Sequence, residues 1–145
     1  MPRVLIIGYG NPLRGDDGFG YQAAERLEDL IHDLDVEIHA VHQLTPELMD
    51  PLSKAGQAIF IDASTGPVPG EVRERDIDPD PSVTPTFTHH LTPEALVAGA
   101  RSLFGRAARS VLITCSVTGF DCSCVLTQPV QVSLGRTVDA VLRRL

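Results

Sequence analysis

The chain has 145 residues, of which 43% are hydrophobic and none is tryptophan, so it suits one domain with an aliphatic core. Its 12 basic and 19 acidic residues give a formal net charge of −7, with Lys54 as its single lysine, which argues against nucleic acid and anionic membranes as partners. No segment approaches the ~20 apolar residues of a membrane span. The apolar run Val4–Ile7 is too short for a signal peptide. Three cysteines cannot all pair within one chain, and we expect a reduced, cytoplasmic protein.

Strand and helix patterns alternate along the chain. Short apolar runs predict buried strands, and apolar residues at spacings of three and four predict helices. The order hydroxyl, proline, glutamate at Thr45 and again at Thr92 is typical of a helix start. The predicted elements, in chain order, are a strand over 3–7, a helix over 18–31, a strand over 36–41, a helix from Thr45, a strand over 58–61, a candidate edge strand over 70–77, a helix from Thr92 to Gly105, a strand over 111–114 or 111–117, and an amphipathic helix ending at Leu145.

This alternation predicts the fold class. Strands that alternate with helices form a mainly parallel, twisted sheet covered on both faces, which gives an α/β fold with three α/β/α layers. Residues 78–88 are rich in Pro, Asp, Ser and Thr and predict an ordered loop without regular structure. No repeat or linker interrupts the pattern, so we expect a single domain over residues 1–145.

The loop after the first predicted strand carries most of the functional information. Residues 8–20 have the sequence GYGNPLRGDDGFG. A dinucleotide fingerprint would need glycine where Leu13 stands, and a phosphate loop would need Lys and Ser or Thr after Gly15. Asp16 and Asp17 stand there instead and would repel a phosphate. The pair has two remaining interpretations, which are capping of the following helix or binding of a cation. Tyr9 and Arg14 flank this loop and are candidates for substrate contacts.

Three more residues are candidates for the same edge of the sheet. Asp62 follows the apolar run 58–61, and the carboxyl ends of parallel strands are where α/β sheets bind ligands. His89 and His90 precede the predicted helix start at Thr92. Alone, Asp62 could equally form a turn and the histidines could equally lie on the surface. Their joint placement with the aspartate pair favours a metal site of carboxylate and imidazole ligands.

These motifs, taken in order, resemble a known family. The segments are Gly8-x-Gly10-Asn11-x-Leu13-x-x-Asp16-Asp17-Gly18-x-Gly20, Ile59-Phe60-Ile61-Asp62-Ala63 and Thr88-His89-His90-Leu91-Thr92-Pro93. They are similar to the signatures of the nickel–iron hydrogenase maturation endopeptidases. The intervening segment His42-Gln43-Leu44-Thr45-Pro46-Glu47 is similar to one branch of that family. The resemblance covers residues 3 to about 105.

The resemblance implies a function. Family members remove a C-terminal extension from the precursor of the hydrogenase large subunit after nickel has been inserted, so the expected partner is that precursor. The resemblance places the nickel-contacting and catalytic cluster on Asp17, Asp62 and His89. Nickel would arrive with the substrate, and zinc or cadmium could occupy the same position. His89 is preferred over His90 because the family histidine lies two positions before the leucine, here Leu91.

Other residues are assigned to substrate binding: Gly10, Asn11, Asp16, His42 and His90. The sequence leaves open whether the metal activates a water as a Lewis acid or serves in recognition while Asp16 or Asp17 acts as general base. It contains no Gly-x-Ser-x-Gly elbow and no cysteine near the proposed site, which argues against a serine or cysteine protease.

Residues 116–127 depart from the family pattern. They carry Cys122 and Cys124, which are either a soft metal-binding pair or, as we favour, ordinary loop residues. Cys115 is expected in the core. Two other functions therefore stay open, a non-proteolytic metal-binding checkpoint module of hydrogenase assembly and another hydrolase on the same scaffold.

Overall fold

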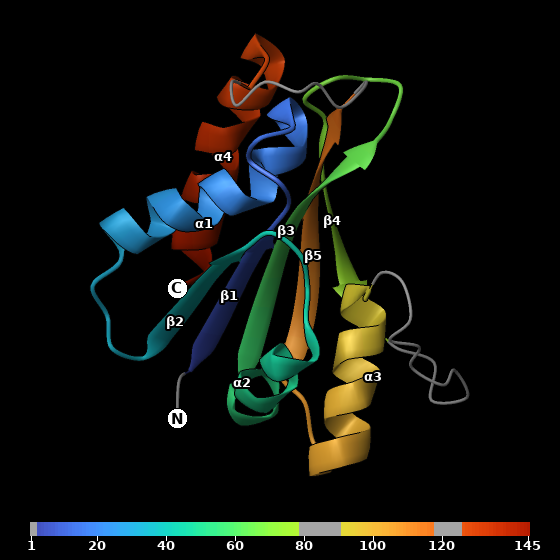
Figure 1. Ribbon diagram of the computed structural model, residues 1–145. Coiled ribbons are helices and arrows are strands. Elements are labelled where there is room, and N and C mark those ends of the chain that lie inside the picture. The colour runs from blue at the N-terminus through green and yellow to red at the C-terminus, as the bar shows by residue number, and fades with distance from the viewer. Residues whose placement is uncertain (1–2, 79–90, 118–125) are drawn as a thin grey trace.

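A five-stranded sheet forms the centre of the molecule (Figure 1). The computed structural model describes residues 3–78, 91–117 and 126–145. The strands are β1 (Val4–Tyr9), β2 (Val36–Val41), β3 (Gln57–Thr65), β4 (Val72–Ile77) and β5 (Arg109–Val117). They lie in the order β2-β1-β3-β5-β4, and all neighbours are parallel except β4, which runs antiparallel to β5 at the edge. The predicted, mainly parallel sheet and its edge strand are confirmed.

Within the described residues, four α-helices cover the two faces of this sheet. The helices α1 (Phe19–Leu30) and α4 (Gln128–Arg144) lie on one face, and α2 (Met49–Lys54) and α3 (Pro93–Phe104) lie on the other (Figure 1). The alternation of side chains along β1 builds both cores, because Val4 and Ile6 pack beneath α1 and α4 while Leu5 and Ile7 pack beneath α2 and α3. A strand buried on both faces is therefore apolar throughout, as its sequence indicated.

The helix boundaries follow from local capping chemistry. The Thr92 hydroxyl oxygen accepts a hydrogen bond from the Ala95 amide at 3.1 Å, and α3 ends at Gly105, whose φ of +79° is the left-handed cap that favours glycine. Both predicted ends of this helix are confirmed. At the other predicted helix start, Thr45, the chain first forms a 3-10 turn over Pro46–Leu48 and then the short helix α2.

β3 is longer than the sequence indicated. We expected it to end at Asp62, but it continues to Thr65 by pairing with β5, in which Asp62 lies opposite Thr114. Its pairing with β1, in contrast, stops at Gly8 and Ile61. Asp62 therefore lies one residue beyond the last pair between β1 and β3. At Asp62, β3 is still paired with β5 on one side but is no longer paired with β1 on the other.

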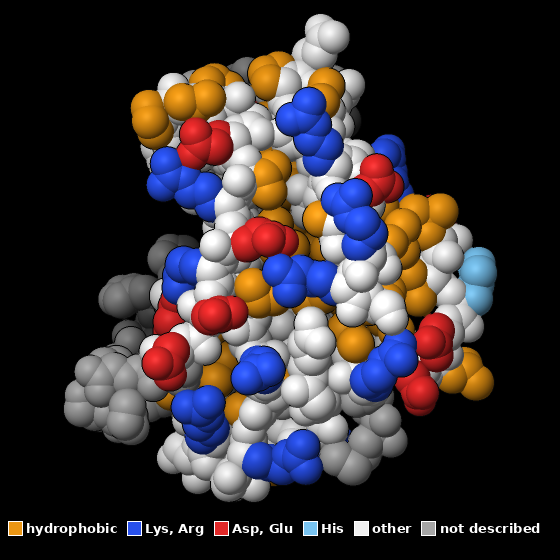
Figure 2. All heavy atoms as spheres, turned by 180° about the vertical axis from the view of Figure 1, so that it is seen from behind, with side chains coloured by type: hydrophobic (Ala, Val, Ile, Leu, Met, Phe, Trp, Pro, Cys, Tyr) orange, Lys and Arg blue, Asp and Glu red, His pale blue; other side chains and the backbone are white. Residues whose placement is uncertain are grey.

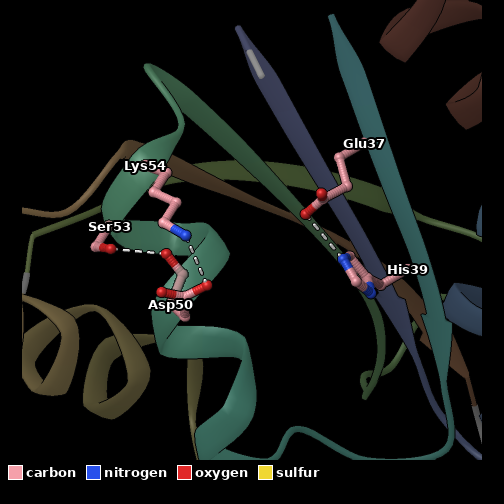
Figure 3. A network of polar contacts seen from close by, with 5 residues as sticks. All are labelled: Glu37, His39, Asp50, Ser53 and Lys54. Atoms are coloured by element: carbon pink, nitrogen blue, oxygen red, sulfur yellow. Dashed lines mark hydrogen bonds and ion pairs between the residues drawn. The ribbon is translucent and has the colours of Figure 1, made fainter. Parts of the chain in front are cut away.

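The outer part of the α2 side of the sheet is polar. Glu37 and His39 of β2 lie beside Leu5 and Ile7 in the β1–β2 register, and their side chains contact each other at 3.0 Å (Figure 3). On the helix itself, Lys54 pairs with Asp50 one turn earlier.

Figure 2 shows the molecule from behind relative to Figure 1, and among the described residues on this side acidic and basic side chains are intermingled. None of the helices in the described ranges is long and apolar enough to span a bilayer.

Candidate active site

Glycines allow the loop after β1 to fold tightly against the start of α1. A Cβ atom on Gly8 would lie 2.0 Å from the carbonyl oxygen of Gly20, so the strand and the helix meet backbone to backbone. Gly10 has a φ of +143°, and a Cβ there would lie 2.0 Å from the carbonyl oxygen of Asp17. The glycines of the first motif therefore satisfy steric requirements, and they bring Asp17 against the end of β1.

Hydrogen bonds within the loop hold Asp17 in one position. The Asn11 amide donates to Asp17 Oδ2 at 3.0 Å, and the Asp17 amide donates to the Arg14 carbonyl oxygen at 3.2 Å. The Asn11 side chain accepts from the Leu13 amide at 3.0 Å and closes the turn between them. These bonds hold the loop around the 3-10 turn Gly15–Gly18, from which the Asp17 side chain reaches the cleft described next.

A cleft of about 1060 Å³ lies at the carboxyl ends of the parallel strands. Asp17 and Asp62 both line it, although they are 45 positions apart in the sequence. The other lining residues are Tyr9, Gly10, Asn11, Arg14, His42, Gln43, Leu44, Thr45, Pro46, Ser64, Arg73, Glu74, Arg75, Leu91, Thr92, Pro93, Glu94, Leu112 and Thr114. The structure thus brings together five residues that the sequence assigned to the site, which are Gly10, Asn11, Asp17, His42 and Asp62.

Asp62 is the most electrostatically perturbed carboxyl group of the site. Burial raises its pKa to about 7, and the Asp17 charge contributes in the same direction. Hydrogen bonds oppose this rise, from the Ala63 amide to Asp62 Oδ1 at 2.7 Å and from the Tyr9 hydroxyl. Burial, followed by the charge of Asp62, raises the pKa of Tyr9 far above its ordinary value, so its hydroxyl remains a donor. Two partly desolvated carboxylates that repel each other form a favourable environment for a divalent cation.

Asp16 points away from the cleft. Its side chain is only 6% exposed, and its two oxygens accept hydrogen bonds from the amide and the hydroxyl of Thr127 at 2.8 and 2.9 Å. The two adjacent aspartates therefore have separate environments. This placement does not support the substrate contact that the sequence suggested for Asp16.

The remaining predicted ligands lie outside the described residues. His89 and His90 fall in the segment 79–90, and Cys122 and Cys124 fall in the segment 118–125. Within the described ranges, no group of three His, Cys, Asp or Glu side chains could hold a metal ion. His42 lines the cleft, and its ring stacks edge to face on Tyr21 with centroids 5.3 Å apart.

The sequence did not identify the far wall of the cleft. Arg73 and Arg75 of β4 line it, and the Arg75 guanidinium forms an ion pair with Glu94 of α3. These residues follow the two acids by at least 11 positions in the chain and show no motif. Only the strand order, which places β4 beyond β5, brings them to the site.

Comparison with known proteins adds an independent observation. No family model matches the chain. A protein from Methanocaldococcus jannaschii, provisionally named a hydrogenase maturation protease, is 26% identical over 149 residues, which cover 96% of this chain and 94% of the relative.

Two solved structures are similar as well. The nickel–iron hydrogenase maturation protease HycI of Thermococcus kodakarensis has a TM-score of 0.77 and 25% identity, over 96% of this chain and 89% of its own. The hydrogenase 2 maturation peptidase of a Thaumarchaeota archaeon has a TM-score of 0.73 and 26% identity, over 98% and 97%.

The fold and the cleft define an α/β protein that presents acidic groups where two adjacent strands diverge. Over nearly its whole length, the chain is similar in sequence and fold to nickel–iron hydrogenase maturation proteases.

Proposed function

We propose that this protein is an endopeptidase that removes the C-terminal extension from the large-subunit precursor of a nickel–iron hydrogenase. The observation that carries the proposal is the convergence of Asp17 and Asp62 in one cleft at the strand ends. The cleft is also large enough for an extended peptide segment, and pockets of roughly 300–1,000 Å³ already hold drug-sized ligands.

Nickel carried by the precursor is the cation that we assign to this cleft. It belongs to the substrate, so the protein needs donor atoms that leave coordination positions open for groups of the precursor. The carboxylates of Asp17 and Asp62 supply two such donors. Zinc and cadmium have similar ligand requirements and are suitable probes of the same position.

His89 is the third proposed ligand. It lies two residues before Leu91, which lines the cleft, so an extended chain allows at most about 7 Å between the two Cα atoms. His90 is one residue closer and is the alternative ligand. The sequence separation therefore keeps both histidines within two residues of a position that lines the cleft.

The other cleft residues bind and orient the peptide in this proposal. Gly10 and Asn11 present backbone next to Asp17, and His42 lines the same cleft. The Tyr9 hydroxyl holds the Asp62 carboxylate by a hydrogen bond. Docking of the nickel would place the scissile peptide against the acids, so that only precursor already loaded with metal is cleaved.

The test is cleavage of nickel-loaded precursor, followed by mass spectrometry of the large subunit. We expect loss of the C-terminal extension with wild-type protein and no loss with metal-free precursor. Asp17→Ala, Asp62→Ala and His89→Ala should each lower the rate by about 100-fold or more. The matched control Asp139→Asn, which removes an exposed acid on α4, should cleave at the wild-type rate.

Two outcomes would overturn parts of the proposal. If the wild-type protein forms a complex with nickel-loaded precursor and leaves it intact, the protein is a checkpoint module and not a protease. If cleavage occurs but all three alanine variants cleave normally, the site residues are wrongly assigned.

A further inference from the structure

We infer that Asp16 is a positioning residue, which fixes the loop that carries Asp17 to the amino end of α4 and so sets the place of the Asp17 carboxylate in the cleft. The inference rests on the proposed function for its catalytic consequence. Its structural part, the dependence of the Asp17 position on the contact between Asp16 and Thr127, can be tested without any substrate.

The contact joins residues 111 positions apart. Asp16 Oδ1 accepts from the Thr127 amide at 2.8 Å, and Asp16 Oδ2 accepts from the Thr127 hydroxyl at 2.9 Å. Hydrogen bonds to an ionised carboxylate are short and strong, and a carboxylate that is 6% exposed depends on them. Because both oxygens are bonded to one residue, the geometry fixes both the distance and the orientation of the side chain.

Thr127 is specialised for this contact. It occupies the position before α4, where a threonine hydroxyl ordinarily accepts from an amide of its own helix. Here it makes no such cap and donates its proton to Asp16 instead. The negative carboxylate also lies at the amino end of α4, where the helix dipole favours it.

The contact is transmitted to Asp17 through the backbone. Asp16 and Asp17 are consecutive residues of one 3-10 turn, and their side chains point to α4 and to the cleft respectively. The bond from the Asn11 amide to Asp17 Oδ2 lies within the loop, so it maintains the shape of the loop. The bonds to Thr127 fix that loop relative to a distant helix. Loss of them would let the loop loosen, so that the bond from the Asn11 amide to Asp17 opens more often and the Asp17 carboxylate is displaced.

The experiment compares three variants at this contact with a control at the other end of the same helix. Asp16→Asn replaces one acceptor oxygen by a donor, and Thr127→Val removes the hydroxyl while preserving the side-chain shape. Thr127→Ser retains both donors. The control, Val141→Ala, removes a fully buried side chain of α4 far from the loop and lowers the stability of the helix packing alone.

Two measurements are made on each variant. Amide hydrogen exchange of Asn11, measured by NMR under native conditions, reports the bond to Asp17. Cleavage of nickel-loaded precursor reports kcat and KM separately. For Asp16→Asn and Thr127→Val we expect exchange of Asn11 to be about 10-fold faster than in Val141→Ala, and kcat to fall by about 10- to 100-fold with little change in KM. Thr127→Ser should resemble the wild type in both.

The outcomes separate the inference from the proposed function. If Asn11 exchanges no faster in Asp16→Asn and Thr127→Val than in Val141→Ala, the contact only stabilises α4 and the inference is overturned. Faster exchange with unchanged kcat also overturns it, because Asp17 would then be displaced without consequence. If the wild-type protein cleaves no precursor, the proposed function fails, and the exchange data still decide whether Asp16 positions Asp17.

Discussion

Replacement of Asp62 by asparagine should stabilise this protein at alkaline pH. The folded structure raises the pKa of Asp62 from 3.8 to about 7, mainly by burial. A carboxyl group with a raised pKa holds its proton more tightly when folded, so the folded state is penalised whenever the pH forces ionisation. The penalty is absent below pH 4, grows as the pH rises from about 4 to 7, and is complete above pH 7.

The magnitude follows from the two pKa values. They differ by about three pH units, and each unit corresponds to about 1.4 kcal/mol, which gives about 4 kcal/mol as an upper value for the penalty. Asparagine is neutral at every pH and retains an oxygen that can accept from the Ala63 amide. We therefore expect Asp62→Asn to raise the free energy of unfolding by about 2–4 kcal/mol at pH 8.5 and to change it little at pH 4.

The assay is urea denaturation of wild type and Asp62→Asn at pH 4, 5.5, 7 and 8.5. The denaturant slope serves as a check that both proteins unfold in one step. Asp139→Asn, at an exposed position, is the control and should show no comparable pH-dependent gain. A gain of equal size at all four pH values, or a loss of stability at pH 8.5, would refute the electrostatic reasoning.

Three further predictions concern the rest of the fold. Thr137→Val should raise the free energy of unfolding by about 1 kcal/mol in urea denaturation, because the Thr137 hydroxyl is buried and has no hydrogen-bond partner among the described residues. A lower free energy of unfolding would indicate that a bound water satisfies the hydroxyl. Gly20→Ala should lower the free energy of unfolding by about 3 kcal/mol or more, because its Cβ would lie 2.1 Å from the Ile61 carbonyl oxygen. The control Gly135→Ala has open space around its Cβ and should raise the free energy of unfolding by about 0.5–1 kcal/mol. Equal effects of the two substitutions in thermal denaturation would contradict the close approach at Gly20. Cys115 should resist alkylation at pH 8 in the native protein, because burial raises the pKa of its thiol to about 11. Peptide mapping by mass spectrometry measures the extent of modification, and alkylation of Cys115 as fast as in an unfolded control would contradict this prediction.

The sequence was informative where structure depends on local chemistry. The Thr92 cap and the left-handed Gly105 could be assigned because the hydroxyl, the proline and the glycine act on residues within one turn. The apolar pattern of Val4–Ile7 predicted a strand buried on both faces for the same reason. The glycine-rich loop with its two acids was found because its residues are consecutive.

The features that the sequence did not predict depend on pairing between strands that are distant in the chain. The length of β3 beyond Asp62 depends on its pairing with β5, and a run of residues does not show which neighbour continues and which turns away. Arg75 reaches the cleft because β4 lies beyond β5, an arrangement that no local pattern encodes.

The two adjacent acids of the first loop show most clearly which features follow from the sequence and which follow from the tertiary structure. The sequence by itself determined that Asp16 and Asp17 would lie in a tight turn at the end of the first strand, because glycine spacing and apolar periodicity are local properties. Only the tertiary structure decided that Asp16 is bonded to Thr127 while Asp17 lines the cleft. The physical reason is that the direction of each carboxylate depends on which hydrogen-bond donors the folded chain brings beside it.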